Sequence, residues 1–81
     1  MFGFKARKME EFYQKNKAFL NWYLIKKCNI PEKLHHFALQ YFVDCLEEDI
    51  LKLVFASEEQ QCKWITTRMD EFAEMEKKRN K

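Results

Sequence analysis

The chain has 81 residues, of which 47% are hydrophobic, 16% aromatic and 35% charged. This length has room for one domain with a small core, and the chain is too apolar to stay disordered. A formal net charge of +2 does not by itself indicate a polyanionic partner. One Gly and one Pro leave few tight turns, which argues against a many-stranded sheet.

Charge is unevenly distributed along the chain. Residues 1–27 carry seven basic and two acidic residues, a net charge of +5, whereas residues 28–62 carry two basic and seven acidic residues, a net charge of −5. Residues 63–81 carry six basic and four acidic residues. The basic first third and the acidic middle third can attract each other within the fold, and the same division can steer a partner.

Residues 5–27 are predicted to form the first helix. Their apolar and aromatic positions follow steps of three and four, the spacing that places side chains on one helical face. The stripe consists of Met9, Phe12, Asn16, Phe19 and Tyr23, widened by Tyr13, Leu20 and Leu24. The sequence CNIP then interrupts the pattern. Pro31 suits the first turn of a second helix, because a backbone N–H is not needed there.

Residues 31–55 are predicted to form the second helix. Their apolar residues keep a period of 3.6 over about six turns, with no Gly, Pro or Asn inside the segment. Two alternatives remain open. Asp44 and Glu47 can form a capping box that divides the segment into two helices. Alternation typical of a β-hairpin is also present, at Phe37, Leu39, Tyr41, Val43, Cys45, Leu51, Leu53 and Phe55.

The hairpin alternative is linked to a family resemblance. The stretch ILKLVFASEEQQCKWI resembles the end of a pleckstrin-homology domain, in which an apolar strand, a small or capping residue, acids and a Trp in the closing helix follow one another. Phe37 is placed like the Phe of an earlier strand of such a domain. The resemblance covers residues 35–74 and implies a hairpin that runs into a final helix, in a C-terminal fragment acting at membranes.

Residues 57–79 are predicted to form the last helix. Ser57 can accept a hydrogen bond from the N–H of Gln60, and the Gln60 side chain can bond back to Ser57, which is the capping-box arrangement. Two acids follow in the first turn and three bases lie in the last turn, as the helix dipole favours. The expected buried stripe is Cys62, Ile65, Met69, Phe72 and Ala73.

These elements predict one helical domain spanning residues 1–81. Its fold class is all-α, with helices near 5–27, 31–55 and 57–79 packed as an antiparallel three-helix bundle. A core of this size is small, so dimerisation is an available way to complete it.

Candidate catalytic and metal-binding residues are few. Cys28, His35, His36 and Cys45 show neither CxxC nor HxxxH spacing, and both histidines are expected on the polar, solvated side of the second helix. The only Ser is explained as a helix cap, and the cysteines have no evident His or acid partners. There is no Gly-rich phosphate loop. We therefore expect no enzymatic activity, no metal and no cofactor.

The second half of the first helix is apolar nearly all the way round, which is typical of a helix covered on more than one side. Ala18, Trp22 and Ile25 lie away from the stripe that the bundle needs. In the last helix, Trp64 and Met75 lie off the main stripe with Arg68 between them, and Trp, Met and Arg are enriched in interfaces. We therefore predict a partner-binding surface made of Ala18, Trp22, Ile25, Trp64, Arg68 and Met75.

Together these features predict a small non-enzymatic regulator or adaptor that binds protein chains through helix–helix contacts, its own copies included. The alternative is a basic helical nucleic-acid binder of weak affinity, and its phosphate contacts would be Lys5, Arg7, Lys8, Lys15, Lys17, Lys26 and Lys27. No apolar run approaches the roughly 20 residues that span a bilayer. Three cysteines without a recognisable signal segment predict reduced thiols and a cytoplasmic location.

Overall fold

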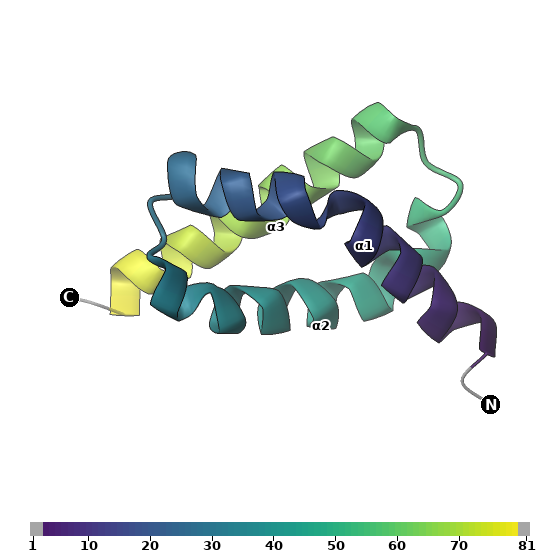
Figure 1. Cartoon of the computed structure of the whole chain (residues 1–81), viewed down its shortest axis with the longest axis horizontal. Helices are drawn as coiled ribbons and strands as arrows, with labels where there is room; N and C mark the ends of the chain where they lie inside the picture. The colour runs from purple at the N-terminus through teal and green to yellow at the C-terminus, as the bar shows by residue number, and fades with distance from the viewer. Residues whose placement is uncertain (1–2, 80–81) are drawn as a thin grey trace.

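Three helices account for most of the chain in the computed structural model, which describes residues 3–79. They are α1 (Gly3–Lys26), α2 (His35–Leu53) and α3 (Glu58–Arg79), with a short 3-10 turn, η1 (Glu32–Leu34), before α2. Consecutive helices run in opposite directions, and each contacts the other two (Figure 1). The predicted all-α three-helix bundle is therefore confirmed.

The hairpin interpretation and the likeness to a pleckstrin-homology domain are wrong. Residues 3–79 contain no strand, and residues 35–53 form one uninterrupted helix. The proposed break at Asp44 is absent, and its carboxylate accepts a hydrogen bond from the Gln40 side chain one turn earlier, at 3.0 Å, instead of capping a new helix. The 3.6-residue period thus prevails over the weaker alternation, because no turn residue divides the segment.

Helix boundaries differ from the prediction by a few residues. α1 begins two residues earlier and ends one residue earlier than expected, which is within the usual uncertainty of helix ends. The second helix was predicted from residue 31, but Pro31 is extended, with φ −64° and ψ 151°, and η1 separates it from α2. The predicted domain spans residues 1–81, and residues 1–2 and 80–81 lie outside the described part.

The α1–η1 connection turns sharply at Asn29, which adopts φ 57° in the left-handed region that Asn tolerates better than most residues. The N–H of Cys28 donates to the carbonyl of Tyr23 at 3.0 Å, and the N–H of Ile30 donates to that of Leu24 at 2.9 Å. These bonds satisfy carbonyls at the end of α1. Ile30 is buried, so the connection is fixed to the core.

The α2–α3 connection is held by polar side chains in the absence of a glycine. The predicted capping box is confirmed: Gln60 N–H donates to Ser57 Oγ, and Ser57 N–H donates to Gln60 Oε1, both at 3.1 Å. The Gln61 side chain donates to the carbonyl of Leu53 at 2.8 Å, at the end of α2. This short joint leaves Phe55 89% exposed.

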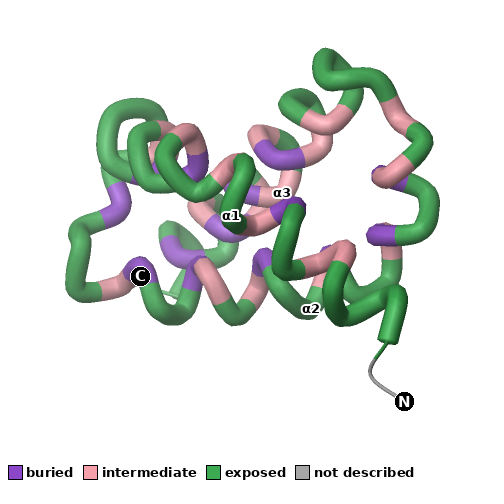
Figure 2. Tube along the Cα trace, turned by 45° about the vertical axis from the view of Figure 1, so that its right-hand side comes forward, coloured by how far each residue is buried: buried purple, intermediate pink, exposed green. Residues whose placement is uncertain are grey.

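The core lies along the shared interior of the three helices, where the buried segments face one another (Figure 2). It consists of Phe12, Leu20, Leu24, Ile30, Ala38, Phe42, Leu46, Ile50, Leu53, Ile65, Met69 and Phe72. Two expectations about burial are wrong. His35 is buried, with Nε2 3.1 Å from the carbonyl of Ile30, because the loop from α1 covers it. Cys62 is exposed instead of joining the core.

Candidate protein-interaction surfaces

The outer side of α1 carries an exposed apolar surface, which we name the α1 patch: Ala18, Trp22 and Ile25. Steps of four and three residues place these side chains on one helical face. Trp22 lies about 200° around the helix from the buried Leu20, so it points away from the core. Trp22 is 47% exposed and Ile25 44% exposed, and Ala18 is exposed as well. The structure therefore brings these three predicted residues together.

Two neighbours hold the Trp22 ring in place on the α1 patch. The ring of Phe19 stacks on it, with 6.1 Å between centroids and 27° between planes. The ammonium group of Lys27 lies 5.6 Å from the centroid of the Trp22 ring, within the range of a cation–π interaction. The large aromatic surface is thus supported from within its own helix and its end, while its outer side faces solvent.

The charged residues that flank the α1 patch in the chain are basic, and one of them pairs with an acid of α3. Between residues 12 and 31 the chain has four lysines and no acidic residue. The lysines are Lys15, Lys17, Lys26 and Lys27, and all four are exposed. Only Lys15 forms an ion pair within the described residues, with Glu58 at 2.9 Å. The α1 patch is therefore an apolar stripe in a positive surrounding.

The predicted residues on α3 lie elsewhere, along the face shared by α2 and α3. Trp64 is partly buried, and its ring meets those of Phe12 and Phe42 edge to face, with centroids 6.0 and 5.7 Å away. The indole N–H donates to the carboxylate of Asp49 on α2 at 2.8 Å. Trp64 therefore packs among all three helices at the edge of the core.

Arg68 and Met75 continue along the same α2/α3 face. The guanidinium of Arg68 donates to Glu71 at 2.8 Å, and the hydroxyl of Tyr41 on α2 donates to the other oxygen of Glu71 at the same distance. The hydrogen bond from Tyr41 to Glu71, together with burial, raises the pKa of Tyr41 above its usual range. Met75 is 45% exposed in a hollow of the α2/α3 face that Phe37 also lines. The six predicted residues thus fall on two separate surfaces.

Two strongly exposed apolar residues were not predicted as site residues. We name Leu51 and Phe55 the α2 patch; Leu51 lies in the last turn of α2 and Phe55 in the connection two residues after its end, and they are 52% and 89% exposed. The periodicity had assigned residues near them to the core. A signal was nevertheless present, because Leu51 follows Glu47 and Glu48 by one helical turn and therefore belongs to the acidic face.

A further apolar feature is the groove between the first half of α1 and α2. It has a volume of about 330 Å³ and is lined mostly by carbon atoms. Its walls are Ala6, Met9, Glu10, Tyr13, Leu39, Val43 and Leu46. The groove shows that α1 and α2 do not fill the space between them at this end of the bundle.

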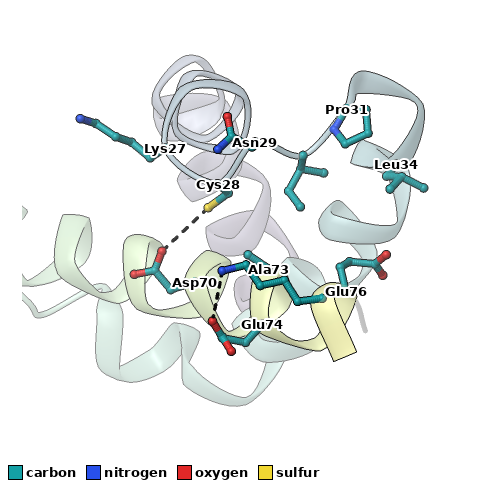
Figure 3. A pocket seen from close by; sticks show the side chains of 11 residues that line it. Lys27, Cys28, Asn29, Pro31, Leu34, Asp70, Ala73, Glu74 and Glu76 are labelled. Carbon is teal, nitrogen blue, oxygen red and sulfur yellow. Dashed lines mark hydrogen bonds and ion pairs between the residues drawn. The ribbon is translucent and has the colours of Figure 1, made fainter. Parts of the chain in front are cut away.

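A hollow of about 540 Å³ lies between the α1–η1 connection and α3 (Figure 3). The Cys28 thiol faces the Asp70 carboxylate across it, with sulfur and oxygen 3.8 Å apart. Burial and the Asp70 charge raise the pKa of Cys28 to about 11, so the thiol stays protonated at neutral pH and is a poor nucleophile. Lys77 pairs with Glu74 at 3.7 Å on the same rim. This mixture of charges favours neither an anionic nor a cationic ligand.

The basic residues of α1 do not form one stripe. At about 100° per residue, the side chains of Arg7, Lys8 and Lys17 point in widely different directions. Lys8 also pairs with Glu11 at 3.4 Å, which reduces its capacity to hold a phosphate. Phosphate contacts by all seven predicted bases would require a nucleic acid to surround the helix. The nucleic-acid alternative stays a prediction that this arrangement does not favour.

Comparison of the chain with known protein families, with characterised proteins and with solved structures found no match. Within residues 3–79, no helix is long and apolar enough to cross a bilayer. The same residues contain no group of three or more His, Cys, Asp or Glu side chains arranged to hold a metal ion.

Proposed function

We propose that the protein is a small non-enzymatic regulator or adaptor that binds protein chains, its own copies included, through helix–helix contacts. The observation that carries the proposal is the α1 patch. An exposed Trp, an exposed Ile and a small Ala in one stripe form the kind of surface that an apolar helix face can cover. A cytoplasmic location belongs to the same proposal, and its support is the three free thiols.

The free energy available from burying the exposed part of Trp22 supports a binding role for this residue. With 47% of its surface exposed, the side chain has roughly 100 Å² left to bury. At about 25 cal/mol per Å² this burial is worth about 2.5 kcal/mol, before the ordering costs of association. The ring is already held by Phe19 and Lys27, so little further side-chain entropy is lost when a partner covers it.

The test is co-purification of the tagged protein from its native cells, comparing the wild type with Trp22→Glu. We expect at least one protein, or an untagged copy of the chain, to be lost from the Trp22→Glu sample. Thr67→Glu is the matched control, because Thr67 is exposed on α3 and receives the same charge outside both patches. Each lost protein would then be purified and its binding measured directly. Equal recovery with the wild type and Trp22→Glu contradicts the proposal.

A further inference from the structure

The α2 patch differs from the α1 patch in its electrostatic surroundings. Glu47 and Glu48 lie one turn before Leu51, and Asp44 lies two turns before it, so all three acids share its outward side of α2. Glu58 and Glu59 follow Phe55 at the start of α3. All five acids are exposed. The bases at this end are Lys52, exposed between Leu51 and Phe55, and Lys15 of α1, which pairs with Glu58. Acids thus outnumber bases around the α2 patch, and its surrounding is negative on balance.

Little of this opposite charge is neutralised within one copy. Among residues 3–79, a single ion pair, Lys15–Glu58, joins the basic first third to the acidic middle third, and both of its side chains are more than half exposed. Asp44, Glu47 and Glu48 form no ion pair in the described part of the chain, and neither do Lys17 or Lys26. The complementary charges therefore remain available to another molecule.

The two patches cannot meet within one copy. The α1 patch lies on the half of α1 nearest the α1–η1 connection, whereas the α2 patch lies at the α2–α3 connection. These connections are at opposite ends of the bundle (Figure 1). A contact between the two patches therefore requires two molecules.

We propose that the α1 patch of one copy binds the α2 patch of a second copy, so that the protein associates head to tail. This inference rests on the proposed function and names the partner surface. Contact between two α1 patches would place lysines against lysines, and contact between two α2 patches would place acids against acids; either juxtaposition is costly. A contact between the α1 patch of one copy and the α2 patch of another, the mixed contact, brings opposite charges together around the apolar residues of both patches.

Binding of a second copy explains both exposed patches, whereas binding to a membrane explains only the α1 patch. A stripe with Trp22 and several lysines is chemically suited to an anionic lipid surface as well. A membrane, however, would leave the acidic α2 patch and the strongly exposed Phe55 without a role. Because the mixed contact is heterologous, each associated pair keeps one free patch at either end, and association grows with concentration instead of stopping at a dimer.

The test uses two variants with complementary defects. Trp22→Glu disables the α1 patch and leaves the α2 patch intact, whereas the double variant Leu51→Lys/Phe55→Lys disables the α2 patch and leaves the α1 patch intact. Sedimentation velocity over a concentration series measures association, and circular dichroism checks that each variant is folded. We expect each variant alone to bind its own copies at least about tenfold more weakly than the wild type does.

Mixing the two variants distinguishes a head-to-tail contact from a contact between two identical patches. The intact α2 patch of Trp22→Glu can meet the intact α1 patch of the double variant, so the mixture should form 1:1 dimers and nothing larger. Association of the wild type should also weaken as salt is raised from 50 to about 500 mM, because screening reduces the charge attraction. Thr67→Glu and Thr67→Lys, which change an exposed residue outside both patches, should associate like the wild type.

Three results would overturn the head-to-tail contact. They are a monomeric wild type at every concentration, two variants that do not restore binding when mixed, and Trp22-dependent binding to vesicles with anionic lipids in the absence of self-association. The proposed function can survive the first two results if Trp22→Glu still loses another protein in co-purification. The proposed function fails together with the head-to-tail contact if co-purification also recovers the same proteins with Trp22→Glu as with the wild type.

Discussion

Trp22 and Trp64 both lie off the main apolar stripe of their helices, yet the fold uses the two side chains differently. Trp64 contacts two core rings and donates its N–H to Asp49 on the neighbouring helix. Trp22 contacts Phe19 of its own helix and Lys27 just after it, and 47% of its surface is exposed. Position relative to the stripe therefore does not decide whether a Trp completes the core.

The difference arises from what lies opposite each residue. Trp64 faces α2, where Asp49 is within hydrogen-bond distance and Phe42 offers a ring. Trp22 faces outward, because Leu20 and Leu24 already occupy the inner side of α1 and are fully buried. A three-helix bundle covers each helix on two sides only, so an apolar third side stays exposed until another molecule covers it.

Truncation of the two rings should separate their roles most strongly. We expect Trp64→Ala to lower the free energy of unfolding by about 3 kcal/mol, because it leaves a cavity against Phe12 and Phe42. Trp22→Ala should change it by less than about 0.5 kcal/mol, since the lost ring was half exposed and Ala favours helix. Urea unfolding at a concentration where the protein is monomeric measures both. Equal losses would show that Trp22 also belongs to the core.

The sequence predicted the helices well because their signals are local. The 3.6-residue period, the reciprocal bonds of Ser57 and Gln60, and the break at CNIP each depend on a few neighbouring residues. Which helix covers which side chain depends on residues far apart in the chain. The hydrogen bond of Trp64 joins residues 15 positions apart, and that of Tyr23 to Asp70 spans 47 positions. Periodicity contains no information about such contacts.

The same limit explains the errors in burial. His35 was expected in solvent because it is polar and lies among polar residues, but the loop after α1 folds over it and offers the Ile30 carbonyl. Cys62 was expected in the buried stripe of the last helix, yet it is exposed. Leu51 lies on the acidic side of α2, and Phe55 lies beyond the end of this helix. Their exposure follows from the direction of the α2–α3 connection, which the sequence does not specify. The α1 patch was predictable because α1 carries too many apolar residues for one core-facing side.

The helix cap at Ser57 provides the next test, since it sets the start of the helix that carries Trp64. Ser57→Ala removes the acceptor of the Gln60 N–H and should lower the free energy of unfolding by about 1 kcal/mol. Thr67→Ala is the control, because it also removes a side-chain hydroxyl, at an exposed position inside α3. Urea unfolding of both variants gives the comparison. An unchanged midpoint for Ser57→Ala would mean that the capping box contributes nothing to α3.

The hydrogen bond between Trp64 and Asp49 should give a coupling free energy no larger than the loss expected for Ser57→Ala. We expect Asp49→Ala to cost about 0.5–1 kcal/mol more in the wild type than in a Trp64→Phe background, where no indole N–H is left to satisfy. The four proteins form a double-mutant cycle in which helix propensity and the charge of Asp49 cancel. Urea unfolding supplies the four free energies. A coupling near zero would leave aromatic packing as the only role of Trp64.

Tyr23 provides the last test, because it follows Trp22 directly but points about 100° away from it, toward α3. Its hydroxyl donates to Asp70 at 2.8 Å. Burial, with this hydrogen bond second, raises the pKa of Tyr23 to about 12, from an ordinary value of 10. The pKa of Cys28, beside the same carboxylate, is raised to about 11 from an ordinary 9. Both groups therefore hold their protons more tightly in the folded state than in the unfolded state.

Stability should consequently fall at alkaline pH. The contribution of each group is complete below its unfolded-state pKa and is lost as the pH rises through its folded-state pKa, so the decline spans about pH 9 to 12. Urea midpoints measured from pH 8 to 11.5 should show this decline, and Tyr23→Phe and Cys28→Ala should each reduce its slope. Trp22→Ala should leave the slope unchanged, because its ring faces away from Asp70. A slope that is the same in Tyr23→Phe and the wild type would show that the inward contact of α1 with α3 does not depend on this proton.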